Sequence, residues 1–299
     1  MIDTIRFKNY RVFRSEQELQ LRPITVVFGK NNSGKSAILK LPILIQNILD
    51  NDGKEVVSDS FEEGPILFTE LRDIIYGKVA KAIEIGVCDS NASVSMDCSF
   101  FIDTTKKPNS RVEKCTFKND TEQHRVSWET ENNYHLNDDD ETVALDFEGI
   151  VPNISNLKKF YENTINKLRY STDYIGAIRV FPQIDMRLQN SQTTKSGVDG
   201  NLSYQMLIAD ALGDSIFLDK VSKWYEKNFA GWGIEVDKSR QPVIHIGMEK
   251  NGLHTNITET GMGIMQSLPI VIRACAPCPK PTLITIEEPE THLHPAAHA

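Results

Sequence analysis

The sequence predicts an α/β fold of the phosphate-loop nucleoside-triphosphatase type, on two observations. Residues 29–36, "GKNNSGKS", match the pattern GxxxxGK(S/T) and follow the β-branched run "ITVVF" at 24–28. Residues 283–288, "LITIEE", read as a buried strand that ends on two carboxylates. A glycine-rich loop between a strand and a helix binds phosphates, and carboxylates at a strand end suit Mg²⁺ binding and water activation.

The phosphate loop lies between a predicted strand at 24–28 and a predicted helix at 35–48. The helix has apolar residues at 38, 41, 45 and 48, and Pro42 should kink it or end its regular part. Lys35 should reach the β- and γ-phosphates, and the Ser36 hydroxyl should bind Mg²⁺. The residues expected to bind the triphosphate are Gly29, Asn31, Asn32, Ser33, Gly34, Lys35, Ser36 and Ala37.

The acidic pair decides between classes of phosphate-loop protein. Glu287 is expected to bind Mg²⁺, and Glu288 to act as the general base that activates the attacking water, with Lys35 as the second catalytic residue. A GTPase or a small-molecule kinase does not need the adjacent second acid followed by proline. More than 200 residues separate the two motifs, which predicts an insertion between the halves of the site. We expect Ser36 and the acid pair to converge on one Mg²⁺.

Composition narrows the possible partners. A chain of 299 residues predicts one large domain with an insertion, or two domains. The net charge of −8, with scattered Lys and Arg, shows no basic face for duplex DNA, so nucleic acid is expected only through a complex. No apolar run is long enough for a membrane span and the N-terminus is not a signal peptide, which predicts a cytoplasmic protein without membrane contact. The acidic run 138–141 is interpreted as a solvated loop tip, with a partner-binding patch as the alternative.

Five cysteines, an odd number, fit a reducing compartment. The only spacing that suggests a pair is Cys275-x-x-Cys278. A redox dithiol or half of a zinc site is possible in principle, but no second pair of ligands is spaced for zinc. We interpret this pair as incidental, in a proline-rich loop.

Three longer segments carry a family resemblance. "KNYRVF…LRPITVVFGKNNSGKS" near the N-terminus, "TETGMGIMQSLPIV" at 258–271 and "LITIEEPETHLHP" at 283–295 resemble an ABC-type ATPase head. The resemblance is to the branch that includes RecF, SMC and the overcoming-lysogenisation-defect (OLD) ATPases. Within it, the chain is similar to small bacterial AAA-labelled ATPases with the EEPExHLHP motif, some of which serve antiphage systems such as Septu. "FTELRDIIYG" at 68–77 and "YIGAIRVFP" at 174–182 also match.

The resemblance implies further site residues. Thr260, Gly261 and Gly263 take the place of the signature turn, which opens a helix at 264–274 and binds the γ-phosphate held by a second subunit. This branch usually carries Ser before Gln266, where this chain has Met265. The contact then rests on backbone N–H groups and Thr260, and hydrolysis is expected to be slow. A glycine turn that only begins a core helix is the alternative.

The segment after the acid pair, 290–295, takes the place of a loop that crosses the dimer interface. A metal site on His292 and His294 is a weaker interpretation of the same residues. ABC heads normally continue beyond the equivalent of Ala299 to a histidine that contacts the γ-phosphate, and we interpret the ending of this chain as a truncation.

The resemblance also implies partners and cofactors. ATP and Mg²⁺ are the expected cofactors, and a homodimer or higher homo-oligomer closes around them. ATP hydrolysis would control a protein partner such as a nuclease, in antiphage defence or DNA maintenance. Two alternatives stay open: an ATP-sensing scaffold that does not turn over, and a small-molecule phosphotransferase.

The remaining segments predict the organisation of the chain. Residues 1–84 and 174–299 are expected to form the two halves of the ATPase head, around an inserted β-hairpin and helical lobe at 85–173. Alternating residues at 82–147 predict antiparallel hairpins. An amphipathic helix is predicted at 156–169, capped by Asn153 or Ser155. Further predicted elements are a loop at 183–201, helices at 202–212 and 214–228, and strands near 232–237, 242–248 and 253–258.

Overall fold

The computed structural model of the chain divides into two compact units. The first comprises Met1–Glu62 and Ile66–Ser171, and the second comprises Thr172–Ala299 together with Glu63–Pro65. The structure describes residues 1–51, 53, 56–57, 64–104, 109–137, 139–189 and 193–293.

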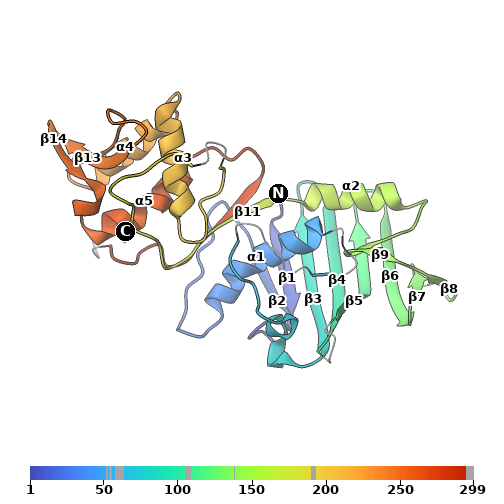
Figure 1. Ribbon diagram of the computed structural model, residues 1–299. Helices are drawn as coiled ribbons and strands as arrows, with labels where there is room; N and C mark the ends of the chain where they lie inside the picture. Colours follow the sequence, from blue (N-terminus) through green and yellow to red (C-terminus); the bar gives the residue numbers. More distant parts are fainter. Residues whose placement is uncertain are drawn as a thin grey trace. The chain divides into compact units, whose positions relative to one another are not determined.

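An eight-stranded antiparallel sheet forms the first unit, in the order β2-β1-β3-β4-β5-β6-β7-β8 (Figure 1). Its period-two pattern buries one face, as in β4, where Val94, Met96, Cys98, Phe100 and Ile102 are buried and the residues between them are not. The hairpins predicted at 82–147 are confirmed. The strands are β1 (Thr4–Lys8), β2 (Gln17–Gln20), β3 (Lys81–Asp89), β4 (Val94–Asp103), β5 (Asn109–Lys118), β6 (Gln123–Thr130), β7 (Asn133–Leu136) and β8 (Thr142–Ala144).

Smaller elements complete the first unit. The 3₁₀ turns η1 (Leu71–Ile74) and η2 (Tyr76–Lys78) precede the long strands of the sheet, and a short hairpin, β9 (Phe147–Glu148) and β10 (Val151–Pro152), follows them. Residues 139–141 of the acidic run are exposed between β7 and β8, as predicted for a loop tip, and Asp138 lies outside the described residues.

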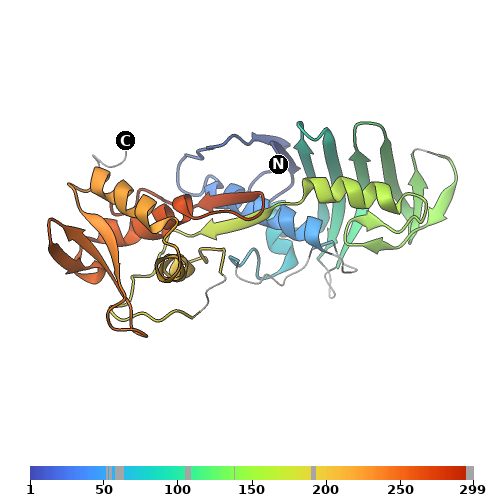
Figure 2. The same cartoon turned by 90° about the horizontal axis from the view of Figure 1, so that it is seen from above.

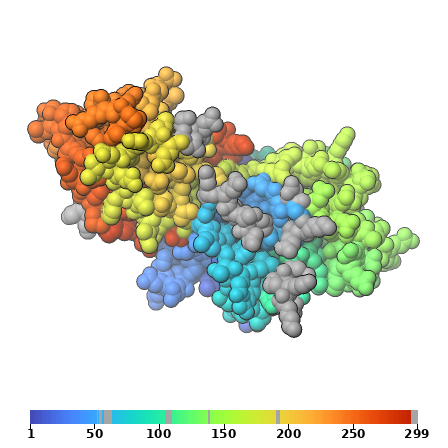
Figure 3. Space-filling view, viewed as in Figure 1, coloured from blue at the N-terminus to red at the C-terminus, as the bar shows by residue number. Residues whose placement is uncertain are grey.

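Helix α2 (Lys158–Leu168) covers part of the sheet. It packs against β3, β4 and β5, and the rings of Tyr161 and Phe117 meet edge to face at 5.1 Å. Its polar face contributes to the surface in Figure 3, in yellow-green. The predicted caps are wrong: the N-cap is Leu157, without a side-chain cap. The backbone of Leu157 bonds to the carbonyl of Ile154 at 3.0 Å, so the predicted caps fall in a turn before the helix.

Helix α1 (Lys35–Asp50) runs through Pro42 without interruption. Of the two outcomes predicted for Pro42, an end to the regular helix is therefore wrong, and a kink stays a prediction. Proline removes one backbone donor, but apolar residues on both sides of Pro42, from Leu41 to Leu49, are buried and hold the helix in place. The Tyr170 hydroxyl donates to the carbonyl of Pro42 at 2.6 Å.

The strand predicted at 24–28 is not formed. Residues 24–28 have no regular structure, and Ile24, Val26 and Phe28 are 84%, 74% and 90% exposed. Figure 2 shows the surrounding segment, in dark blue, as a long loop between β2 and α1. A buried parallel strand needs neighbouring strands on both sides, and the sheet of the first unit pairs only antiparallel strands. Strand propensity alone does not supply such neighbours.

The second unit is a mixed α/β structure around one apolar core. Helix α3 (Asn201–Leu212) packs on α5 (Met262–Cys275), and α4 (Leu218–Asn228) packs on α5 and β12. An antiparallel sheet of β12 (Gly233–Asp237), β13 (His245–Lys250) and β14 (Leu253–Asn256) adjoins them, followed by the 3₁₀ turn η3 (Ile257–Glu259). The helices and strands predicted at 202–258 are confirmed.

Helix α4 begins four residues later than predicted because Asp210 binds the preceding segment. The two carboxylate oxygens of Asp210 accept hydrogen bonds from the backbone N–H groups of Ile216, Phe217 and Leu218, at 2.8–3.1 Å. A carboxylate that binds the first free N–H groups fixes the start of a helix. Here that carboxylate comes from α3.

Strands β11 (Ser171–Ile175) and β15 (Thr282–Ile286) pair with each other. The N–H of Glu287 donates to the carbonyl of Ile175 at 2.9 Å, so the C-terminal ends of both strands lie side by side and the pair is parallel. The predicted strand at 283–286 is confirmed. The acid pair therefore follows the carboxyl edge of a parallel pair, a common place for binding sites in α/β folds.

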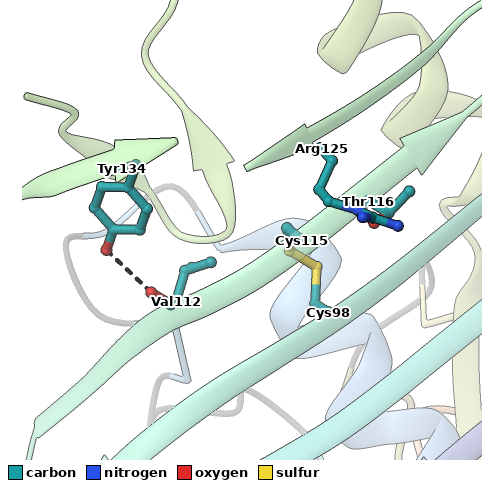
Figure 4. Close-up of a disulfide and its surroundings, with 6 residues drawn as sticks. All are labelled: Cys98, Val112, Cys115, Thr116, Arg125 and Tyr134. Atoms are coloured by element: carbon teal, nitrogen blue, oxygen red, sulfur yellow. Dashed lines mark hydrogen bonds between the residues drawn. A yellow bond between two sulfur atoms is a disulfide. The ribbon is translucent and has the colours of Figure 1, made fainter. Parts of the chain in front are cut away.

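A disulfide joins Cys98 of β4 to Cys115 of β5 (Figure 4). The register of the two strands places these residues directly opposite each other, with a Cα–Cα distance of 4.2 Å. The expectation that these cysteines do not pair is wrong, because a separation of 17 residues carries no signal until the hairpin register is known. Among the described residues, no helix is both long and apolar enough to cross a bilayer.

Candidate functional site

The phosphate loop is an exposed turn that leads into the N-terminus of α1. Asn32 and Gly34 both have positive φ, at 61° and 96°, which turns the backbone sharply. Gly34 is the N-cap, and no side chain caps the helix. The first N–H groups of α1 therefore have no side-chain acceptor, and such a helix end favours an anion.

Lys35 lies within the loop. Its ammonium donates to the carbonyls of Gly29 and Lys30, both at 2.9 Å. The loop thus bends around one positive charge, and Ser36, the next residue, is exposed. A lysine ammonium held at the centre of a glycine-rich turn is suited to binding a phosphate.

The segment "YRVF" at 10–13 lies behind the loop and dictates Gly34. A Cβ atom at Gly34 would lie 2.6 Å from Cζ of Phe13 and 2.7 Å from a methyl carbon of Val12. Tyr10 is buried and donates to the carbonyl of Ala37 at 3.1 Å, and burial raises the pKa of its hydroxyl to about 12. The segment "KNYRVF" therefore packs against the phosphate loop and restricts position 34 to glycine.

Glu287, at the end of β15, has an unsatisfied oxygen. Its Oε1 atom is buried and finds no hydrogen-bond partner among the described residues. Tyr174 lies beside the same carboxylate, and burial together with the charge of Glu287 raises the pKa of the Tyr174 hydroxyl. A buried carboxylate oxygen without a donor is a costly arrangement that a bound cation would relieve.

Glu288 has a left-handed backbone conformation, with φ of 45°. This conformation is uncommon for residues other than glycine, asparagine and aspartate, and such strain concentrates at functional sites. Its exposed carboxylate accepts a hydrogen bond from the Thr291 hydroxyl at 3.2 Å, and its carbonyl accepts one from the Thr291 N–H, also at 3.2 Å. With a further bond from the N–H of Leu293 to the carbonyl of Glu290 at 3.0 Å, residues 287–293 form a compact acid turn.

Arg179 connects this acid turn to α5. Its side chain is 3% exposed, and Nη2 donates to the carbonyls of Glu287 and of Glu288, the latter at 2.9 Å. The amide of Gln266, in α5, donates to the carbonyl of Arg179 at 3.0 Å. Burial lowers the pKa of the guanidinium, and the carboxylates of Glu288 and Glu290 oppose that shift.

The proposed signature turn meets the acid turn directly. Gly261 is the N-cap of α5, and Gly263 lies so close to the acid turn that a Cβ atom there would be 2.8 Å from the carbonyl oxygen of His292. The Thr260 hydroxyl donates to the carbonyl of Ile257 at 2.6 Å. Met265 is buried in the core of the second unit.

The cysteine and histidine pairs form no metal site in the described part of the chain. No group of three or more His, Cys, Asp or Glu residues there is placed to bind a metal ion. Cys278 instead accepts a hydrogen bond from Nη2 of Arg273 at 2.8 Å, and Cys275 ends α5. His294 lies outside the described residues.

These observations fit a nucleoside triphosphate with Mg²⁺. The loop has an uncapped helix terminus and a central ammonium for phosphate, and Glu287 has a buried oxygen for a hard cation. The loop residues 29–37 belong to the first unit. The acid pair and the signature turn both belong to the second unit. There Arg179 bonds to the carbonyl of Glu288, and Gly263 of the signature turn lies close to the main chain of His292.

Arg179 was not predicted as a site residue, although it lies in the segment "YIGAIRVFP" that carries part of the resemblance. The available signal was a charged residue within the apolar run "AIRVF", because an arginine in such a run is buried only with partners. Tyr10 and Phe13 also lie in a segment that carries the resemblance, and their contacts with the loop depend on packing between distant segments.

Comparison with known proteins agrees with the general part of this site. The model of a family described as an AAA ATPase domain matches residues 1–298. No curated protein matches the chain. The family match supports a phosphate-loop fold with ATP binding and hydrolysis at a general level.

Proposed function

Because the chain belongs to the AAA ATPase domain family, we propose that it is an ABC-type ATPase that uses ATP to control a partner. The observation that carries this proposal is the phosphate loop. Phe13 and Val12 leave no room for a side chain at position 34, the N-terminus of α1 has no side-chain cap, and Lys35 is turned into the loop. ATP would bind through residues 29–37, with Lys35 at the β- and γ-phosphates.

The acid turn supplies the chemistry. Glu288 accepts a proton from the attacking water as general base, and the Thr291 hydroxyl orients its carboxylate. Ser36 and Glu287 would hold a magnesium ion, which would neutralise charge on the phosphates. We propose that these two residues bind the same ion. Ser36→Ala and Glu287→Gln should then each weaken Mn²⁺ binding in the presence of ATP, and the double variant should be little weaker than either single variant.

Two copies would close around ATP. Thr260, Gly261 and the N-terminus of α5 are exposed or half-buried at the surface of the second unit, where a second copy's triphosphate would meet backbone N–H groups. Contacts that exist only in the closed dimer make ATP a switch. The residues 290–293 adjoin this turn through Gly263 and complete the same surface.

The decisive experiment compares two variants in both assembly and turnover. With Glu288→Gln, ATP binds but is not cleaved, so light scattering should show an ATP-dependent dimer or larger species, and steady-state hydrolysis should fall about 10²–10⁴-fold. Lys35→Ala should abolish both. If Glu288→Gln hydrolyses ATP like the wild type, or never assembles with ATP, the proposal is wrong.

A second candidate function is an ATP-sensing scaffold that does not turn over. Two observations favour it: Met265, which stands where the resemblance implies a serine, is buried, and the Thr260 hydroxyl donates to the carbonyl of Ile257. The signature turn then offers mainly backbone groups to the γ-phosphate. The wild type would bind ATP tightly but release phosphate no faster than Lys35→Ala, whereas the ATPase predicts turnover that Lys35→Ala removes.

The biological setting that we propose is antiphage defence or DNA maintenance, with a nuclease as the protein partner. Its support is the resemblance of the three motif segments. Phage plating efficiency on cells that express the chain with its genomic neighbours tests the first setting. Protection that survives Lys35→Ala would contradict an ATP-driven role.

A further inference from the structure

Arg179 is the one buried charge among the described residues that contacts both the acid pair and the signature helix. A buried guanidinium loses hydration, and an ion without partners is strongly disfavoured inside a protein. Its donors do not go to a neighbouring carboxylate, however. They go to the main-chain carbonyls of Glu287 and Glu288.

We propose that Arg179 is a positioning residue for catalysis, which holds Glu288 in its left-handed conformation and ties it to the signature helix. The proposal rests on the proposed role of Glu288 as general base. Nη2 binds both carbonyls of the peptide units that flank the φ rotation of Glu288, so it fixes that rotation from outside the turn. Arg179 does not itself contact the reacting atoms.

The second half of the arrangement is reciprocal bonding with α5. The Gln266 amide donates to the Arg179 carbonyl at 3.0 Å, and Nη1 of Arg179 lies 3.5 Å from the Gln266 carbonyl. Gln266 is in the first two turns of α5, the helix that the signature turn opens. Movement of the signature helix is thereby passed to the backbone of the acid pair, which links closure on a second copy's ATP to the alignment of the base.

Arg273 provides a matched control within the same unit. It is also buried, at 1% exposed, and it also donates to main-chain carbonyls, those of Thr194, Ala276 and Pro277. Unlike Arg179, it also lies 3.6 Å from a carboxylate oxygen of the buried Asp173. None of these residues belongs to a motif. A role limited to folding would make the two arginines equivalent, whereas positioning of Glu288 makes them different.

The test compares Arg179→Lys with Arg273→Lys. Lysine keeps the charge, but its ammonium is one bond shorter than Nη2 and lacks the fork geometry. We expect both variants to lose thermal stability. Only Arg179→Lys should lower kcat, about 10²-fold, with the Kd for a fluorescent ATP analogue changed less than twofold. In the Glu288→Gln background, Arg179→Lys should cause almost no further loss, since the base it positions is already gone.

A readout without nucleotide separates this inference from the proposed function. Amide hydrogen exchange of the peptide covering 283–293 should accelerate in Arg179→Lys and stay unchanged in Arg273→Lys. If the wild type proves to have no turnover, the proposed function fails, yet this exchange still decides whether Arg179 holds the acid turn. Equal exchange and equal kcat in the two variants would overturn the inference.

A less disruptive variant tests the same link if Arg179→Lys does not fold. Gln266→Ala removes one hydrogen bond to the Arg179 carbonyl and leaves the guanidinium in place. It should lower kcat several-fold and accelerate exchange in the same peptide. Wild-type values for both measurements would contradict the link between α5 and the acid turn.

Discussion

At the scale of single residues, Asp73 shows how one carboxylate organises a motif. It lies in "FTELRDIIYG", binds the backbone N–H groups of Thr69 and Glu70 at 3.3 and 3.1 Å, and pairs with the ammonium of Lys78 at 2.8 Å. The Lys78 side chain and the Glu70 N–H hold the pKa of Asp73 at about 2. The segment therefore forms a 3₁₀ turn that Asp73 helps to cap.

Asp73→Ala should therefore lower stability in a pH-dependent way. A carboxylate whose pKa is lowered on folding contributes stability above its unfolded pKa, near 4, and loses this contribution as pH falls toward 2. The variant should be about 1 kcal/mol less stable at pH 6, the usual cost of a lost cap. Urea unfolding should show this gap narrowing by pH 3. Asp140→Ala, in the exposed turn between β7 and β8, is the control and should show no such gap.

At the scale of elements, the sequence predicted those that are determined locally or by a neighbour in the same hairpin. Alternation predicted β3 to β8, the helical period predicted α1 and α2, and the family resemblance predicted α5. The predictions were wrong where a residue in another element determines the local structure. Asp210, in a preceding helix, sets the start of α4, and the register of β4 and β5 creates the disulfide. Of the candidate site, the loop and acid residues were predictable from motifs, but Arg179 acts through carbonyl groups that no pattern of side chains reveals.

Segment 24–28 is the clearest disagreement between propensity and structure. Because Val26 is 74% exposed, we predict that Val26→Thr changes stability by less than about 0.5 kcal/mol, as for other surface substitutions. Val87→Thr, at a fully buried position in β3, is the matched control. It should cost about 1–3 kcal/mol, because it places a hydroxyl in an apolar core.

The same pair of variants decides whether this segment is a strand. Equal destabilisation of the two variants in chemical unfolding would mean that 24–28 is buried in solution, as its β-branched sequence first suggested. The result would also bear on the phosphate loop, which begins at Gly29 directly after this segment.

At the scale of the whole molecule, the disulfide should make the two units respond differently to a reductant. Cys98 and Cys115 close a loop of 17 residues within the first unit, for which chain entropy predicts about 3 kcal/mol of stabilisation. Reduction should therefore accelerate hydrogen exchange in peptides from β4 and β5, and leave peptides from α3, α4 and β12 unchanged. Cys88→Ser, which alters a free cysteine of β3, should not reproduce the effect. Equal acceleration in both units would contradict it.

The close approach of Gly263 to His292, together with the Gln266–Arg179 bond, predicts where compensating mutations should arise. The signature turn and the acid turn pack against each other, so a destabilising mutation in one turn should be compensated most readily by a mutation in the other. A bulky residue at Gly263 would meet the main-chain oxygen of His292, so selection for second-site suppressors should recover substitutions at residues 290–293 that shift the main chain there. Suppressors should be rare in the codons of the eight-stranded sheet.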